Sequence, residues 1–236
     1  MKRLAVLVAS AAVLTLTPAM ASGAQAGPVH RLRAGLATNW AGYVAHGGPF
    51  SSASTTYAEP SISCGANENS AVASFAGIDG ANSPTVEQIG TFATCKNGSI
   101  AHQAFFEMFP KAAVGIGKRV RAGDSLTATV LATSTKTFTL SLVNHTEGWT
   151  FSTQQRSRKA QRSSAEAITE APSLRGSGVV NLANFGQINY SGTTANGQPI
   201  SNFGPEEVTM VTNGGTVKAQ PTALSGGSFS VVWHHA

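Results

Sequence analysis

The sequence predicts an all-β protein, an antiparallel β-sandwich or barrel, for three reasons. Past residue 37 apolar and polar residues alternate with period two, which indicates strands with one buried and one solvated face. Asn-Gly pairs separate several of these runs and supply the positive φ of tight hairpin turns. No later segment combines helix caps with a 3.6-residue period. Because the chain has 236 residues, we expect one medium domain rather than two.

The N-terminal region predicts export from the cell. Lys2 and Arg3 precede an apolar run at 4–17, and A-x-A-like cleavage sites follow at 19–21 and 24–26. The run is too short for a membrane span, which needs about 20 residues. We therefore expect a secreted, monomeric protein that is free of the membrane after cleavage. The expected segments are a signal peptide at 1–21 (with cleavage after residue 26 as the alternative), a short N-terminal segment at 22–36 and a β-sandwich domain at 37–236.

The two cysteines are expected to form a structural disulfide. Cys64 and Cys95 are the whole cysteine content of the chain, and an oxidising extracellular compartment favours their pairing. The bridge would remove unfolded-state entropy worth roughly 3–4 kcal/mol. Two free thiols or half a metal site is the less favoured reading, because no Cys-x-x-Cys spacing is present.

The alternation of apolar and polar residues is clearest at 126–130, 138–142 and 229–233. The sequence also predicts the strand pairing of one further hairpin. If the Asn-Gly pair at 97–98 forms a two-residue loop, Gln88 faces Glu107 across the two strands. On the same face Gly90 then lies opposite Phe105. Periodicity alone favours a polar pair on the solvated face of an ordinary hairpin.

Composition restricts the chemistry that this chain offers. Charged residues make up 11% of the chain and only eleven are acidic, whereas about 25% of an ordinary soluble protein is charged. The net charge of +5 falls to +3 once Lys2 and Arg3 are removed, so we expect no nucleic-acid partner. Basic residues at 156–162 are expected to form a solvated loop.

Several common catalytic sites are absent from the sequence. There is no Gly-x-Ser-x-Gly elbow, no nucleotide-binding glycine motif and no His-x-x-x-His spacing, so we expect neither a metal nor a cofactor. Glu166 and Glu170 are four residues apart, so an unbroken strand points both side chains to one face. The carboxylates in or beside apolar strand-like segments are Asp79, Glu87, Glu107, Glu166 and Glu170.

Five short segments follow one another in a distinctive order: N-W-A-G-Y-V at 39–44, G-I-D-G at 77–80, T-V-E-Q-I-G-T at 85–91, F-E-M-F-P at 106–110 and S-A-E-A-I-T-E-A-P-S at 164–173. Together they resemble the glutamic peptidases, or eqolisins, which are secreted acid endopeptidases insensitive to pepstatin. The resemblance covers nearly the whole chain from residue 37. It implies polypeptide substrates and a concanavalin A-like sandwich of two curved antiparallel sheets, as in lectins and glucanases.

Residue by residue, the resemblance assigns the catalytic pair to Gln88 and Glu170. In the implied mechanism Glu170 takes the proton of an attacking water and later gives it to the leaving amine, while Gln88 holds the water and stabilises the oxyanion. An acidic optimum follows if Glu170 keeps a pKa near about 4.3. The resemblance places further cleft-lining or supporting residues at Asp79, Glu107, Trp40, Phe75 and Phe105.

The chain departs from the pattern of the family at three positions. Phe75 and Phe105 replace frequent Trp residues, which keeps an apolar wall and removes indole N–H donors. Ala167 stands where a bulky aromatic residue is usual, so other side chains must fill that volume.

Two other functions stay open when the residues are taken alone. One is a secreted carbohydrate-binding or glycoside-hydrolase sandwich, in which Glu166 with Glu170 or Glu107 imitates a retaining pair about 5–5.5 Å apart. Three Trp and 7% aromatic residues offer few platforms for a sugar. The other is a catalytically inactive relative that keeps the fold.

Overall fold

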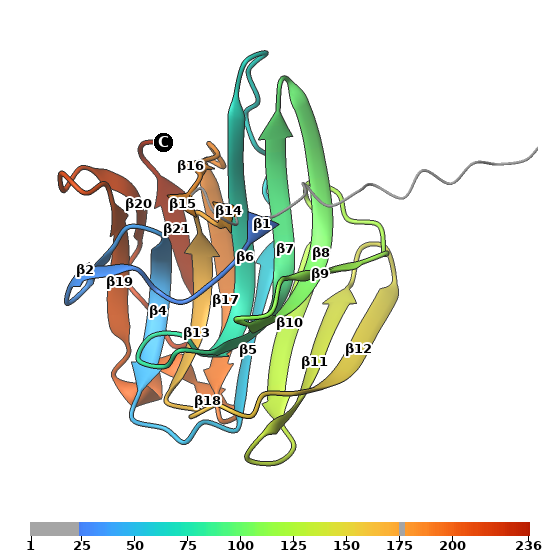
Figure 1. Cartoon of the computed structure of the whole chain (residues 1–236), viewed down its shortest axis with the longest axis vertical. Helices are drawn as coiled ribbons and strands as arrows, with labels where there is room; N and C mark the ends of the chain where they lie inside the picture. The colour runs from blue at the N-terminus through green and yellow to red at the C-terminus, as the bar shows by residue number, and fades with distance from the viewer. Residues whose placement is uncertain (1–23, 175–177) are drawn as a thin grey trace, which may run out of the picture.

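The computed structural model describes residues 24–174 and 178–236 and confirms the predicted fold class, with two antiparallel sheets packed face to face (Figure 1). The helical structure in these ranges is one 3-10 turn, η1 (Ile200–Phe203). No helix in the same ranges is long and apolar enough to cross a membrane. The predicted signal peptide at 1–21 lies outside the described residues.

The front sheet carries Gln88 and Glu170, the predicted catalytic pair. Each pair of neighbours in it is antiparallel. In spatial order its strands are β9 (Val114–Ile116), β8 (Ser99–Phe109), β7 (Val86–Lys96), β6 (Asn69–Asp79), β13 (Ser164–Glu170), β4 (Trp40–His46) and β19 (Glu206–Val211).

The back sheet packs against the inner face of the front sheet, and its last strand also pairs with β19, which joins the two sheets. In spatial order its strands are β12 (Trp149–Arg156), β11 (Thr137–Asn144), β10 (Ser125–Ala132), β5 (Ser52–Ala58), β17 (Gln187–Ala195), β21 (Phe229–Trp233) and β20 (Val217–Pro221). Short strands complete the chain: β1 (Ala24–Gln25), β2 (Arg31–Arg33), β3 (Leu36–Ala37), β14 (Ser173–Leu174), β15 (Gly178–Val179), β16 (Asn181–Leu182) and β18 (Gln198–Pro199).

The core between the sheets follows the period-two pattern that the sequence predicts. Along β10 the residues Leu126, Ala128 and Val130 are fully buried, and their polar neighbours are partly exposed. On β11 Leu140 and Leu142 alternate in the same way. Burying each such leucine stabilises the fold by about 1.5–3 kcal/mol, so the alternation fixes which face of each strand turns inward.

Two of the three Asn-Gly turns are the tight hairpins that the sequence predicts. Asn97 and Asn196 have φ of 49° and 50°, and each begins a two-residue loop completed by a glycine with positive φ. The prediction is wrong for the pair at 213–214. There the ladder shifts register between Met210 and Val211, so the loop spans 212–216 and the positive φ falls on the glycine at 215.

The predicted disulfide is confirmed. Cys64 and Cys95 are bonded, with their Cα atoms 5.4 Å apart. The bond ties the chain before β6 to the end of β7, two residues from the Asn97 turn.

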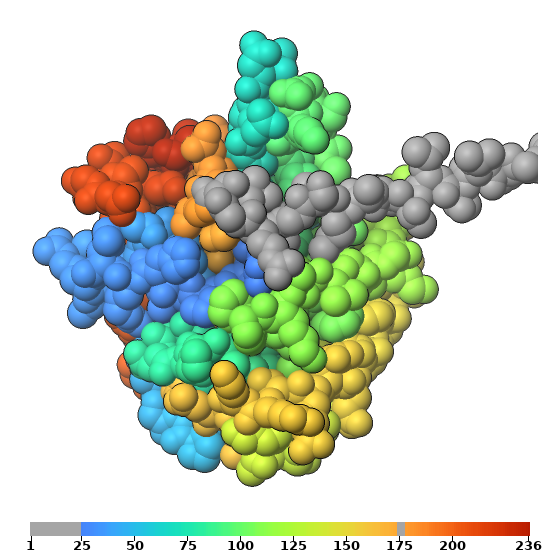
Figure 2. Space-filling model, viewed as in Figure 1, coloured from blue at the N-terminus to red at the C-terminus, as the bar shows by residue number. Residues whose placement is uncertain are grey.

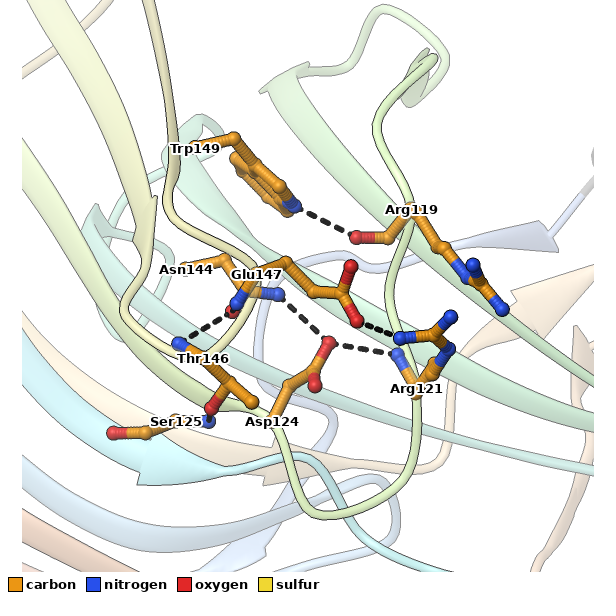
Figure 3. Close-up of polar contacts among 8 residues, drawn as sticks. All are labelled: Arg119, Arg121, Asp124, Ser125, Asn144, Thr146, Glu147 and Trp149. Atoms are coloured by element: carbon orange, nitrogen blue, oxygen red, sulfur yellow. Dashed lines mark hydrogen bonds and ion pairs between the residues drawn. The ribbon is translucent and has the colours of Figure 1, made fainter.

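A polar cluster fastens the β11–β12 turn to the chain that precedes β10 (Figure 3). The carboxylate of Asp124 accepts hydrogen bonds from the Asn144 side chain at 2.7 Å and from the Arg121 amide at 2.9 Å. The side-chain oxygen of Asn144 in turn accepts from the amides of Thr146 and Glu147 at 3.0 and 2.9 Å. A single buried Asn–Asp pair therefore holds two loops together.

Candidate active site

The predicted polar residues meet on the outer face of the front sheet. Gln88 of β7 pairs with Glu107 of β8 on one side and with Gly77 of β6 on the other. Glu166 of β13 lies beyond Gly77 in the same row. Glu170 is on the same face of β13, four residues further along. The predicted register of the hairpin and the predicted common face of the two β13 carboxylates are both confirmed.

Gln88 and Glu107 are fully buried, so the interpretation of a polar pair in solvent is wrong. The Gln88 amide donates to Glu107 Oε2 at 3.2 Å, and Gln88 Oε1 and Glu107 Oε1 have no hydrogen-bond partner among the described residues. Burial raises the pKa of Glu107 to about 9, although the nearby Gln25, Gln88 and Ala26 amides oppose the shift. Glu107 is therefore a neutral acid below that pH.

Glu170 lies at the end of β13, beside Trp40 of β4 and Ala73 of β6. Its carboxylate accepts hydrogen bonds from the Gly27 amide, at 3.1 and 3.3 Å to the two oxygens, and from the Asn39 side chain at 3.2 Å. Burial nevertheless raises its pKa well above the usual range, and Glu107 adds to the shift. The near-normal pKa assumed for an acidic optimum is therefore not met in this structure, in which the hydrogen bond from Gly27 opposes the shift and burial outweighs it.

Glu166 and Glu87 are buried carboxyl groups without hydrogen-bond partners in the described part of the chain. Glu166 lies over Gly77, where a Cβ atom would approach its Oε1 to 2.6 Å, so a side chain at this position would displace the carboxyl group of Glu166. Burial raises the pKa of Glu166 well above its usual range. Burial raises the pKa of Glu87 to about 8; nearby Ser157 opposes that shift and Asp79 adds to it. Both groups therefore hold a proton at acidic pH.

Asp79 supports the site without entering it. At the end of β6 it adopts a φ of 73°, and its carboxylate accepts hydrogen bonds from the amides of Gln161, Arg162 and Ser163 at 2.8, 2.9 and 2.8 Å. The hydroxyl of Ser163 adds a fourth bond at 2.9 Å. Asp79 thus anchors the loop that leads into β13.

Aromatic side chains form an apolar wall beside the carboxylates. Trp40 meets Phe75 edge to face with ring centres 5.8 Å apart, and Phe92 stacks on Phe105 at 4.0 Å. Gly90 lies under this wall, because a Cβ there would approach Phe75 to 2.8 Å. All four aromatic residues are buried, so the predicted apolar wall is present.

Sequence reasoning missed Phe92 and Asn39. Phe92 follows Gln88 and Gly90 on the same face of β7, and period two was the signal that could have found it. Asn39 stands inside the first quoted motif and binds Glu170, yet nothing in its sequence position marks that contact. Ala167 belongs to the core between the sheets, so its small volume affects packing there and not the outer face.

The surroundings of the site contain no candidate metal centre within the described ranges, since no three His, Cys, Asp or Glu side chains converge. A cavity of about 540 Å³ opens at the end of β8, with Met108 and Lys111 among its lining residues. Arg156, Arg158 and Lys159 line its other wall and are exposed, as expected for a solvated loop.

Comparison with known proteins assigns the chain to a family. The sequence profile of the Peptidase A4 family matches residues 38–233. No protein with a curated description matches the chain.

Three solved structures share the fold. The chain is similar to scytalido-glutamic peptidase in complex with a peptide-based transition state analog, with a TM-score of 0.72 and 23% identity over 84% of this chain and 98% of that one. It is similar to SCP-B, an eqolisin bound to the tripeptide Ala-Ile-His, with a TM-score of 0.69 and 22% identity over 84% and 98%. For aspergilloglutamic peptidase from Aspergillus niger these values are 0.60 and 22% over 70% and 99%. The chain belongs to the Peptidase A4 family and is a glutamic-type peptidase.

Proposed function

We propose that this protein is a secreted, monomeric endopeptidase that cleaves polypeptides with Gln88, Glu170 and an activated water, at acidic pH and without inhibition by pepstatin. One observation carries the assignment of Glu170: its carboxylate already receives a peptide N–H, that of Gly27, at 3.1 and 3.3 Å. This contact shows that Glu170 lies within hydrogen-bond reach of a peptide nitrogen, so its acid form, once it has taken a proton from water, can protonate a leaving nitrogen there.

The chemistry divides between the two side chains. Glu170 in its ionised form takes a proton from water, and the resulting carboxylic acid protonates the leaving nitrogen. Gln88 is neutral at every pH, and its amide can donate to the oxyanion that develops on the carbonyl. Its partner Glu107 fixes the orientation of that amide.

Glu107 and Glu166 are the rival carboxylates. Glu107 accepts one hydrogen bond, from Gln88, and its Oε1 has no partner among the described residues. Glu166 has no donor to either oxygen, whereas Glu170 has two donor groups that stabilise its ionised form. Glu170 is therefore the carboxylate best supported as the base.

Export is supported by the predicted signal peptide at 1–21 and by the disulfide between Cys64 and Cys95. Disulfides persist in oxidising compartments and are rare in the cytosol. We propose cleavage after residue 21, so that the secreted chain begins at Ser22 and the domain occupies 37–236.

Cleavage of a denatured protein between pH 3 and 7, with pepstatin present throughout, tests this function. Glu170→Gln keeps the shape of the side chain and removes its basicity, so activity falls by about 10²–10⁴-fold. Gln88→Ala removes the oxyanion donor and lowers kcat by about 10²–10³-fold. Glu166→Gln is the matched control and retains most activity. If Glu166→Gln abolishes cleavage and Glu170→Gln does not, the dyad is assigned wrongly.

A further inference from the structure

The cavity at the end of β8 has walls from both sheets. Lys111, just past β8 of the front sheet, lines one side, and Arg156, Arg158 and Lys159, at the end of β12 of the back sheet and just after it, line the other. In Figure 2 the green segment that follows β8 and the gold segment that follows β12 both lie on the visible face. The volume of about 540 Å³ is typical of ligand-binding cavities. We call it the basic cavity.

The positive charges around the basic cavity have no acidic partners in the described part of the chain. The ion pairs found there use Arg31, His46, His102 and Arg121 instead. Arginine and lysine side chains are positive throughout the acidic range. Four cationic groups around one cavity attract an anion, and arginine suits a carboxylate because its guanidinium group can bind both oxygens.

The carboxyl group beside the basic cavity does not cancel this charge. Glu87 is buried next to Thr85 and Ser157, which both line the cavity. Burial raises the pKa of Glu87 to about 8, so this group is neutral at acidic pH. Asp79 lies near Glu87, but its carboxylate accepts hydrogen bonds from the amides of residues 161–163. An anion in the cavity therefore meets an excess of positive charge.

The backbone of both walls is fixed by hydrogen bonds. The amide of Ser157 donates to the carbonyl of Lys136 at 3.0 Å. The Lys136 side chain donates to the carbonyl of Ala160, which is buried between the sheets. On the other wall the amide of Lys111 donates to the carbonyl of Met108 at 3.0 Å. Walls that are already ordered reduce the entropy that a ligand loses on binding.

The basic cavity lies within reach of a peptide bound at the candidate active site. Thr85 precedes Gln88 by three residues at the start of β7, which corresponds to about 10 Å at about 3.3 Å per residue. Met108 directly follows Glu107, the partner of Gln88. Because an extended substrate has the same rise per residue, a chain whose peptide bond lies at Gln88 reaches the cavity about three to five residues away.

We propose that the basic cavity binds an acidic stretch of the polypeptide substrate, three to five residues from the bond that is cut; this inference rests on the proposed function. The carboxylates of the substrate pair with Arg156, Arg158 and Lys159. The methylene groups of a glutamate side chain pack on the apolar lining that Met108 and Phe109 provide. The cavity thereby gives the enzyme a preference for acidic polypeptides.

Cleavage of matched peptides tests this preference. Each peptide carries three Glu or three Gln residues, placed three to five positions before the cleaved bond in one series and equally far after it in the other. At pH 5 we expect the Glu peptide of one series to have a kcat/KM about fivefold higher than its Gln twin, through a lower KM. An exposed ion pair changes affinity by about 1.5- to 5-fold, and several act together here.

Two conditions should abolish the preference in the wild type. At pH 3 the glutamates of the peptide are mostly protonated, because their usual pKa is about 4.3. In 1 M NaCl the attraction between exposed charges is screened beyond about 3 Å. We expect the ratio of the two kcat/KM values to fall towards one in both cases.

A pair of double variants separates the basic cavity from the overall charge of the protein. Arg158→Gln/Lys159→Gln reduces the fivefold ratio to below about twofold. Lys118→Gln/Arg119→Gln removes the same charge from two neighbouring exposed residues that do not line the cavity, and it retains the full ratio. Fluorescence anisotropy with a labelled hexaglutamate peptide and Gln88→Ala measures binding without turnover, and this binding should weaken about fivefold when Arg158→Gln/Lys159→Gln is added.

The outcomes distinguish this inference from the proposed function. A preference that persists in Arg158→Gln/Lys159→Gln, or that is lost equally in Lys118→Gln/Arg119→Gln, overturns the inference, because the net charge is then responsible. If the Glu and Gln peptides are cut equally well, the cavity does not select the substrate and the proposed function stands. If hexaglutamate binds in the cavity and the wild type cuts no peptide, the proposed function itself fails.

Discussion

The polar cluster at the β11–β12 turn and the carboxyl groups of the front sheet use buried polar groups in opposite ways. At the turn Asp124 and Asn144 are buried and saturated with hydrogen bonds from each other and from loop amides (Figure 3). In the front sheet Glu87, Glu166 and Glu107 are equally buried and keep oxygens without partners. A buried group whose hydrogen-bonding atoms all have partners anchors a loop. A buried carboxyl group with unpartnered oxygens retains its proton and remains available to take part in a reaction.

The largest effect that we expect from this contrast is a loss of stability as the pH rises. In the unfolded chain Glu87 titrates near about 4.3, and in the folded protein burial raises its pKa to about 8. The folded state therefore binds the extra proton between these values, and the free energy of unfolding falls with rising pH through that window. One such group removes about 3–5 kcal/mol across it. Glu166 lies nearby and acts in the same direction.

Urea denaturation of Glu87→Gln between pH 4.5 and 8 checks this. The amide cannot ionise, so the dependence of unfolding free energy on pH is shallower by about 1.4 kcal/mol per pH unit than in the wild type. Glu147→Gln, in the saturated cluster, serves as control and follows the wild-type slope. A Glu87→Gln curve parallel to the wild type would show that this carboxyl group is ionised in the folded state.

The saturated cluster predicts a smaller loss that does not depend on pH in the same way. Asn144→Ala removes the donor to Asp124 and the acceptor for two loop amides. Leaving a buried carboxylate short of one donor costs about 2–3 kcal/mol. Asn144→Asp retains the acceptor and adds a like charge beside Asp124, so it is at least as destabilising. Thermal unfolding of both variants measures the difference, and a change below about 0.5 kcal/mol for Asn144→Ala would contradict the role of the cluster.

The sequence predicts the pairing in the front sheet better than the environment of the paired residues. The Asn97 turn sets the register, and that register correctly places Gln88 opposite Glu107. Burial was predicted wrongly because the covering residues come from the N-terminal segment around Ala26 and from other strands, far away along the chain. Alternation is a local signal and reports only that two faces differ; it does not say what lies above a face.

The same limit explains the other differences between sequence and structure. The Asn-Gly pair at 213–214 suits a tight turn, yet the loop there is longer, and Lys218 is an extra residue in β20, the strand that follows it. Glu87 and Gln88 are neighbours that point to opposite faces, and both are buried, so composition alone could not assign their roles. The contact of Asn39 with Glu170 joins residues 131 positions apart, so it is found only once the fold brings the start of β4 beside the end of β13.

The smallest effect is expected for substitutions of Glu107, which test whether this buried carboxyl group functions in its neutral form. Burial raises the pKa of Glu107 to about 9, so the side chain is uncharged at acidic pH. Glu107→Gln replaces one neutral group by another that can still accept the hydrogen bond from Gln88, and kcat changes by less than about threefold below pH 6. Glu107→Ala deprives Gln88 of its partner and lowers kcat by about tenfold, which corresponds to about 1.4 kcal/mol. Initial rates on one peptide at pH 4 separate the two variants. If the glutamine variant is as impaired as the alanine variant, Glu107 acts through its charge, and the contrast between the partly unpaired carboxyl groups of the front sheet and the fully hydrogen-bonded loop cluster fails at this residue.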